Sequence, residues 1–236
     1  MKVSLLFVAI SCVFVSSLLV SNLTGVKIID LHGCLLPAGA LIFPFSYIFS
    51  NIITEVYGYA YCRFVLWLSF ICYLCMGAYV LLVVHLPAAD FWPAQAAYAS
   101  VLGPVPRIFC ASIAAFMASE FANAYVLARL KVRQQGHGLF WRCTLSTFVA
   151  VVVDSLVFLP IAYGANLINY HNWLRLAITL VVWKLSYEIL AFPITKQVIA
   201  YIKQQEQLDY FDHHTAFNPF SLSLHHQVQN QKIPLH

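Results

Sequence analysis

The sequence predicts an all-α, polytopic integral membrane protein with about six transmembrane helices in one bundle. The first observation is composition: 61% of the 236 residues are hydrophobic and 9% are charged, with a mean hydropathy of +0.79. A soluble domain carries about 25% charged residues, so lipid must solvate most of this chain. The second observation is that the apolar residues form runs of spanning length, each close to the ~20 residues that a bilayer requires. The runs lie at 3–22, 36–54, 63–86, 107–129, 140–164 and 174–202.

The first run follows Lys2 and could be mistaken for a signal peptide. It is long for the apolar region of such a peptide and no A-x-A site follows it, so we interpret it as the first transmembrane helix. The second run is the shortest and most polar. None of the runs alternates as a transmembrane strand would. Turn-forming residues separate the runs, at 30–33, 58, 86–87, 103–104, 134–136 and 166–172.

These boundaries predict a six-helix transmembrane domain at 1–203 and a polar cytoplasmic C-terminal tail at 204–236. The tail is rich in His and Gln, with His pairs at 213–214 and 225–226. A solvated tail is the favoured interpretation, with metal binding as the alternative. Cys72 and Cys75 form a C-x-x-C without a nearby His or acidic ligand, which favours simple packing. We therefore expect no metal site and no cofactor.

The distribution of Lys and Arg predicts the orientation. With the N-terminus inside, the inner loops hold Lys2, Arg63, Arg129, Lys131, Arg133, Arg142, Lys196 and Lys203, and the outer loops hold Lys27, Arg107 and Arg175. An even number of spans then places both termini in the cytoplasm. We expect the protein to lie in the inner membrane of the cell. We expect the cluster at 129–133 to serve topology and contact with anionic lipid. The formal charge of +4 reflects this asymmetry, and we expect no nucleic-acid partner.

Several spans carry polar side chains, which cost at least ~2.5 kcal/mol each when charged at membrane depth and therefore face a bundle interior or a cavity. On the second run, Tyr47, Asn51, Thr54 and Glu55 share one helical face with Ser46 nearby. The other candidates are Glu120 and Asn123 on the fourth run, Ser146, Thr147, Asp154 and Ser155 on the fifth, and Lys184 and Glu188 on the sixth.

Each candidate has a structural alternative. Lys184 and Glu188 are spaced to pair with each other on one helix. Glu55 could be solvated at the cytoplasmic mouth. Asp154 has no cation on its own helix, so it needs a partner from another helix, a ligand or a proton. An interior with four carboxylates and one lysine suits a substrate rich in N–H donors, a cation, or a proton relay.

The order of these polar residues resembles that of the queuosine precursor transporter family, which is also grouped with vitamin uptake transporters. The resemblance covers most of the chain and is most specific in the T-E-V-Y-G block at 54–58 together with the D-S-x-x-F block at 154–158. Further matches are F-P-F-S-Y-I at 43–48, W-R at 141–142, A-Y-G at 162–164, W-K at 183–184 and F-N-P-F at 217–220. Asn51 and Asn123 depart from the family, which often has Asp at both positions.

The resemblance implies import of 7-deazaguanine precursors of queuosine, a modified tRNA base. A guanine-like ring presents an N–H and an exocyclic amine side by side, and one carboxylate can accept both. Amides or hydroxyls can address the remaining ring atoms, and aromatic side chains can cover its faces. The implied substrate-binding residues are Asn22, Ser46, Tyr47, Asn51, Glu55, Glu120, Asn123, Ser146, Asp154 and Lys184.

The leading hypothesis is therefore a secondary transporter for a small nitrogen-rich heterocycle. The chain has no G-x-x-x-x-G-K-[ST] motif, so any use of ATP would require another protein. The alternative is a substrate-capture subunit of an ATP-driven uptake complex. We do not expect an enzyme, because His32, His85 and His171 fall in loops and H-E-x-x-H is absent. The expected partners are the substrate and the bilayer, and homo-oligomerisation is left open.

Overall fold

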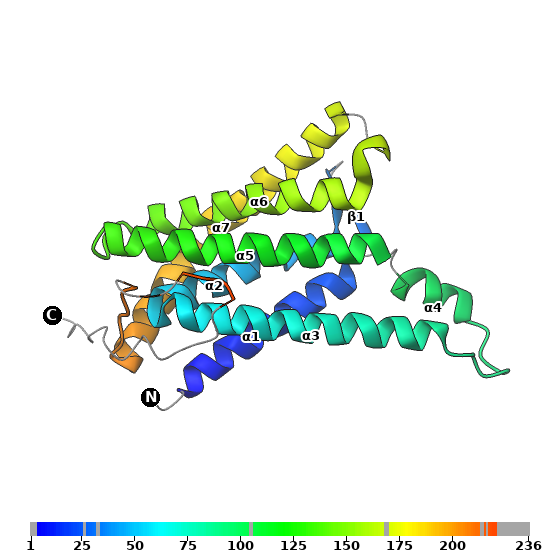
Figure 1. Cartoon of the computed structure of the whole chain (residues 1–236), viewed down its shortest axis with the longest axis horizontal. Helices are drawn as coiled ribbons and strands as arrows, with labels where there is room; N and C mark the ends of the chain where they lie inside the picture. The colour runs from blue at the N-terminus through cyan, green and yellow to red at the C-terminus, as the bar shows by residue number, and fades with distance from the viewer. Residues whose placement is uncertain are drawn as a thin grey trace.

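The computed structural model describes residues 4–25, 27–31, 34–103, 106–167, 170–212, 215 and 217–220. Six long helices dominate it, and they correspond to the six predicted spans (Figure 1). The elements are α1 (Leu5–Thr24), β1 (Ile28–Leu31), β2 (Cys34–Pro37), the 3₁₀ helix η1 (Ala38–Leu41), α2 (Pro44–Tyr57), α3 (Tyr59–His85), α4 (Gln95–Leu102), α5 (Pro106–Arg133), α6 (Leu139–Leu167) and α7 (Tyr170–Glu206).

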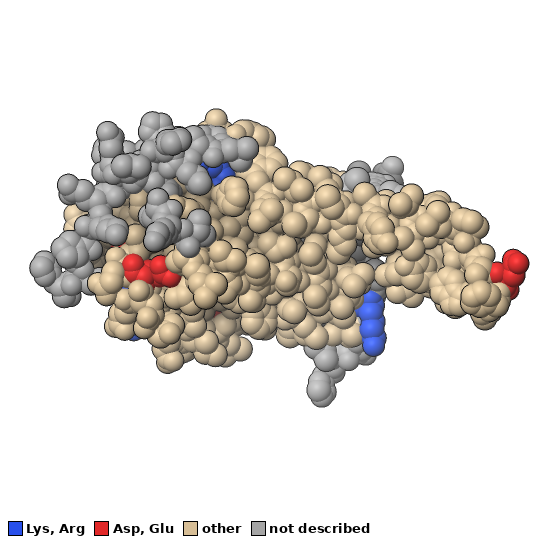
Figure 2. All heavy atoms as spheres, turned by 90° about the horizontal axis from the view of Figure 1, so that it is seen from below, with Lys and Arg blue, Asp and Glu red and all other residues tan. Residues whose placement is uncertain are grey.

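The predicted all-α membrane bundle is confirmed. Five segments of the described chain are long and apolar enough to cross a membrane: Leu5–Thr24, Ala38–Tyr57, Tyr59–His85, Ala111–Arg133 and Leu139–Phe158. Helix α7, at 37 residues, is the remaining long helix. Large apolar side chains on α1, α3 and α6 are exposed, as lipid contact requires. Few charged side chains appear on the face shown in Figure 2.

The segment before α2 differs from the prediction. The second helix was expected to begin near residue 36, but Cys34–Pro37 pairs antiparallel with Ile28–Leu31, and η1 follows before α2 starts at Pro44. Proline is favoured in the first turn of a helix, which explains the late start. Ser21 of α1 donates a hydrogen bond to the Gly39 carbonyl at 2.8 Å. A Cβ at Gly39 would lie 2.1 Å from the Ser21 carbonyl oxygen, so this approach requires glycine.

Helix α2 lies at the centre of the bundle. It packs against α1, α3, α5 and α7, and every residue from Pro44 to Tyr57 is buried except Phe45 and Phe49. A helix surrounded by other helices can carry polar side chains on more than one face without exposing them to lipid. This position explains why the second run is the most polar one in the sequence.

The two ends of the bundle differ in structure (Figure 1). The first turn of α1, the turns α2–α3 and α5–α6, and the last turn of α7 lie at one end, which we call the inner end. The β1–β2 hairpin, α4 and the end of α3 lie toward the other, outer end. This arrangement agrees with an even number of passes. The orientation of the bundle in the membrane stays a prediction.

The chain after α7 folds back over the inner end. We call its described part, within 208–220, the strap. The Tyr210 N–H donates to the Val56 carbonyl at 3.3 Å, and the Tyr210 ring packs on Gly58 at the α2–α3 turn. Gly58 has φ +89°, and an added Cβ would lie 2.3 Å from that ring. Helix α7 continues to Glu206, past the predicted boundary at residue 203.

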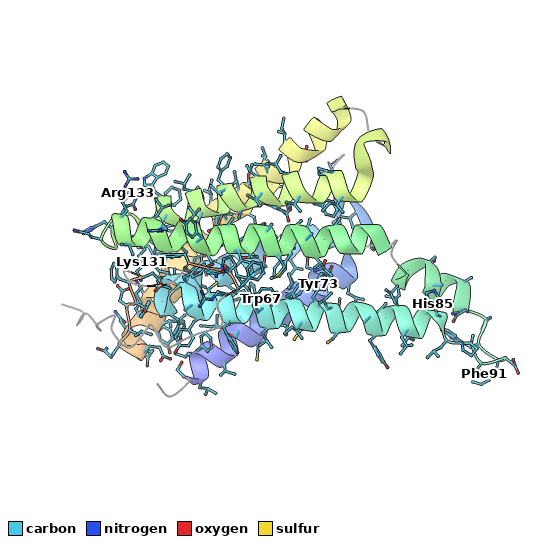
Figure 3. The ribbon with its side chains drawn as sticks, viewed as in Figure 1. Trp67, Tyr73, His85, Phe91, Lys131 and Arg133 are labelled. Atoms are coloured by element: carbon cyan, nitrogen blue, oxygen red, sulfur yellow. The ribbon has the colours of Figure 1, made fainter. Side chains whose placement is uncertain are left out.

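Lys131 contradicts the prediction made for the basic cluster at 129–133. Its side chain is 1% exposed and lies within the inner end, although a lipid-facing or solvated position was expected. Figure 3 shows Lys131 directed into the bundle, whereas Arg133 points away from it. The lysine is buried because it binds acceptors from α2 and the strap, which a count of charges along the sequence does not reveal.

A buried polar centre between four helices

One face of α2 organises the candidate site. Phe43, Tyr47, Asn51 and Glu55 follow each other at intervals of four residues, so they stack along one side of the helix and its N-terminal cap. Each of them meets a different set of side chains from α5, α6 and α7. The result is three levels of polar contact, which we call the outer pair, the polar centre and the inner cluster.

The polar centre consists of Tyr47, Asn51, Glu120, Asn123, Thr147 and Glu188, all at most 1% exposed. Asn51 connects three other helices. Its Nδ2 donates to Glu188 Oε1 at 3.0 Å and to Thr147 Oγ1 at 3.4 Å, and its Oδ1 accepts from Asn123 Nδ2 at 3.0 Å. These contacts join α2 to α5, α6 and α7 through a single amide.

Several buried atoms of this region have no hydrogen-bond partner among the described residues. Both carboxylate oxygens of Glu120 are unpaired, as is Oε2 of Glu188. The remaining unpaired atoms are Asn123 Oδ1, Ser46 Oγ and Tyr47 OH. The hydroxyls of Ser46 and Ser50 lie beside the Glu120 carboxylate, in positions from which they can approach it as hydrogen-bond donors. A buried polar atom without a partner costs about 1–3 kcal/mol, so a ligand or water that supplied hydrogen bonds here would stabilise the centre.

The outer pair is formed by Asp154 on α6 and Lys184 on α7, whose Oδ2 and Nζ atoms are 2.7 Å apart. The Lys184 ammonium also lies 4.4 Å from the centroid of the Phe43 ring and 5.8 Å from that of Tyr47. Trp183 fixes this part of α7 by donating to the Ala40 carbonyl at 3.1 Å. Lys184 and Glu188 therefore do not pair with each other as their spacing allowed: the lysine binds Asp154 and the glutamate binds Asn51.

The inner cluster surrounds Glu55, whose side chain is 1% exposed. Its Oε1 lies 2.8 Å from Arg142 Nη2, 2.9 Å from Lys203 Nζ and 3.7 Å from Lys131 Nζ. Asp209 of the strap binds the same two lysines, at 2.6 Å from Lys131 and 2.9 Å from Lys203. Glu55 is therefore not a solvated carboxylate at the mouth. It joins the inner ends of α2, α5, α6 and α7.

Most of the implied substrate-binding residues lie on the three levels along α2. Asn22 and Ser146 are the exceptions. Asn22 accepts from the Tyr73 hydroxyl at 2.6 Å between α1 and α3, and Ser146 donates to the Cys143 carbonyl of its own helix at 2.9 Å. Glu188, Thr147 and Phe43 also contact this site, although they are not among the implied substrate-binding residues. Glu188 was interpreted as the ion-pair partner of Lys184 because the two are four residues apart. That spacing allows a pair on one helix but does not exclude a partner on another helix.

The bundle of long apolar helices defines a multi-pass membrane protein, and its interior holds carboxylate oxygens without partners among the described residues. The sequence model described as "Putative vitamin uptake transporter" matches residues 37–198, and the chain belongs to this family. It is 25% identical over 174 residues to the "Probable queuosine precursor transporter" of Bacillus subtilis (strain 168), covering 73% of this chain and 76% of that protein. The predicted family is thereby confirmed. No solved structure shows significant similarity to the chain.

Proposed function

We propose that this protein is an inner-membrane secondary transporter that imports 7-deazaguanine bases, the precursors of queuosine, and that the polar centre binds them. The family and the name of the Bacillus subtilis relative support the substrate class. The chain supplies no catalytic group in this proposal. Its helices hold the base, exclude water and release the base on the other side of the membrane.

The observation that carries the proposal is the state of Glu120. Its side chain is 0% exposed and both of its oxygens lack partners among the described residues. Two adjacent N–H donors on a planar ring match the two oxygens of one carboxylate. Asn123 Oδ1, Ser46 Oγ and Tyr47 OH offer further unpaired groups nearby for the rest of the ring. The base would therefore replace several missing hydrogen bonds at once.

Asp154 keeps a place in this proposal as the partner of Lys184. The pair is neutral as a unit and lies beside Phe43 and Tyr47, so it can stay buried while no substrate is bound. A base entering next to these rings would stack on them and compete for the Asp154 carboxylate. Asp154 would then pass between Lys184 and the substrate during the transport cycle.

The test is uptake of radiolabelled 7-deazaguanines, with nitrile or aminomethyl side groups, into liposomes that contain only this protein and an imposed ion gradient. Uptake without any other protein supports a secondary transporter. Uptake that requires an added ATPase supports the substrate-capture alternative. Glu120→Gln should reduce binding by roughly tenfold or more, because the amide places a donor opposite the donors of the ring.

Glu206→Gln is the matched control, since it makes the same chemical change at the last residue of α7. Normal affinity in Glu120→Gln, at equal amounts of folded protein, would remove Glu120 from the site. Absence of uptake of every tested 7-deazaguanine by the unmodified protein, with and without an ATPase, would reject the proposed substrate class.

A further inference from the structure

The inner cluster lies between the polar centre and the inner end of the bundle. On α2, Glu55 lies one helical turn beyond Asn51. On α6, Arg142 lies just over one turn before Thr147, which contacts Asn51. The buried Cys143 thiol is located between the two levels, within electrostatic reach of Glu188 on one side and of Glu55 and Arg142 on the other. A ligand leaving the centre toward the inner end would have to pass this layer.

The strap covers the same end with several further contacts. Both carboxylate oxygens of Asp212 accept from the Tyr59 N–H, at 3.0 and 3.2 Å, at the start of α3. Arg63 donates to the Asn218 carbonyl at 2.9 Å and Trp67 to the Pro219 carbonyl at 2.8 Å. Arg129 of α5 lies 4.6 Å from the centroid of the Phe217 ring. The strap thus bridges the α2–α3 turn to α5.

The strap and the inner cluster depend on each other through Lys131. This lysine donates to the Glu55 carbonyl, to the Tyr210 carbonyl at 2.6 Å and to Asp209 at 2.6 Å. Two of its three acceptors belong to the strap. If the strap moved away, Lys131 would lose those acceptors and Lys203 would lose Asp209, so water would have to enter to solvate both lysines. Undocking of the strap therefore favours opening of the cluster.

We propose that the inner cluster and the strap form the inner gate of the transport pathway, and that the structure described is the state in which this gate is closed. Charged side chains suit such a gate because each can exchange its protein partner for water when the layer opens, whereas separation of the same charges in a dry interior would be very costly. The inference rests on the proposed function only for the existence of a transported ligand. The closure itself concerns side-chain packing and is tested without transport.

The test measures how fast a membrane-impermeant maleimide labels Cys143. All other cysteines of the full-length chain are replaced by alanine, and labelling is followed in membrane vesicles that present the inner end to the outside. The parent protein should react slowly because the thiol is buried. Asp212→Ala, which leaves all five charges of the inner cluster in place, should increase the labelling rate by roughly tenfold. Glu55→Gln should increase it at least as much.

Lys196→Gln is the matched control, because Lys196 is exposed on α7 and takes part in none of these contacts; its labelling rate should stay unchanged. Rapid labelling of the parent protein, or an unchanged rate in Asp212→Ala, would overturn the gate. If Glu55→Gln fails to accumulate, Asp212→Ala decides alone. Labelling needs no substrate. The gate can therefore be rejected while the proposed function holds, and the proposed function can be rejected while the gate holds.

Discussion

At position 51 an amide can donate a hydrogen bond to Glu188, whereas a carboxylate would repel it. The amide nitrogen of Asn51 donates to Glu188 and its oxygen accepts from Asn123, so both ends of the group are used. An Asp at position 51 would place a second acceptor against Glu188 in a buried site. The two asparagines of this chain are therefore matched to the glutamate on α7.

This match predicts the result of a double-mutant cycle. Asn51→Asp should lower the free energy of unfolding by about 1–3 kcal/mol, because a donor to Glu188 becomes an acceptor. Adding Glu188→Gln should recover part of that loss, since the new amide can donate to the carboxylate introduced on α2. Thermal unfolding of the two single variants and the double variant in detergent measures the coupling. Strictly additive losses would mean that the Asn51–Glu188 hydrogen bond contributes nothing.

The contributions of Asp209 and Asp212 in the strap to the stability of the protein should change with pH in opposite directions. Burial alone would raise the pKa of Asp209, but Lys131 and Lys203 outweigh it and hold the pKa below the usual value. A lowered pKa in the folded state stabilises the protein above the unfolded value of about 3.9, and this contribution is lost as the pH falls through the folded value. The pKa of Asp212 is raised, chiefly by burial. Its contribution is therefore largest at low pH and declines as the pH rises.

The melting temperatures of Asp209→Asn and Asp212→Asn at several pH values test these signs. The unmodified protein should exceed Asp209→Asn by a constant difference between about pH 5 and 7. Its advantage over Asp212→Asn should shrink as the pH rises above about 4. A difference for Asp209→Asn that disappeared by about pH 5 would show that the two lysines do not lower the pKa of this carboxyl.

At the scale of elements, α2 connects all three levels of the site through one face. It is also the shortest of the six long helices: its 14 residues rise about 21 Å, less than the ~30 Å hydrocarbon core. The β1–β2 hairpin and η1 supply the remainder at the outer side. Non-helical backbone near a membrane core is tolerated where other protein segments cover it, and η1 packs against α1.

The register of α2 should tolerate no insertion. One alanine inserted after Ile48 would rotate Asn51 and Glu55 by about 100° relative to Phe43 and Tyr47, which separates the aromatic rings beside the outer pair from Asn51 and from the inner cluster. Uptake of the 7-deazaguanine should be lost. An alanine inserted after Pro93, in the exposed segment between α3 and α4, is the control and should leave uptake intact. Preserved uptake in the α2 insertion would show that the shared face of α2 is not required.

Some of this organisation was accessible from the sequence and some was not. Apolar runs predicted the long helices because burial in lipid requires length and composition alone. The polar face of α2 followed from helical periodicity. Partner choice did not follow: Lys184 binds Asp154 thirty residues away instead of Glu188 four residues away. Lys131 was misplaced for the same reason, because a charge at the end of a helix indicates topology and does not reveal a buried acceptor.

For the whole molecule, the positions of the turns predict the outcome of a topology experiment. A reporter that is active only outside the inner membrane should be silent when fused after Gln135, in the α5–α6 turn at the inner end. The same reporter fused after Asp90, between α3 and α4, should be active. Both fusions depend on the excess of Lys and Arg at the inner end. A strong signal after Gln135 would reverse the orientation of the bundle.

The strap also has a consequence for biosynthesis. It leaves the ribosome after all six long helices, yet it supplies Lys131 with two of its three acceptors. Until those residues are synthesised, the inner cluster holds three cations, Lys131, Arg142 and Lys203, against the carboxylate of Glu55. A chain that stops short of the strap would therefore enter the membrane with its inner end wet and loosely joined. Docking of the strap would then complete the set of acceptors around Lys131 and close the inner end.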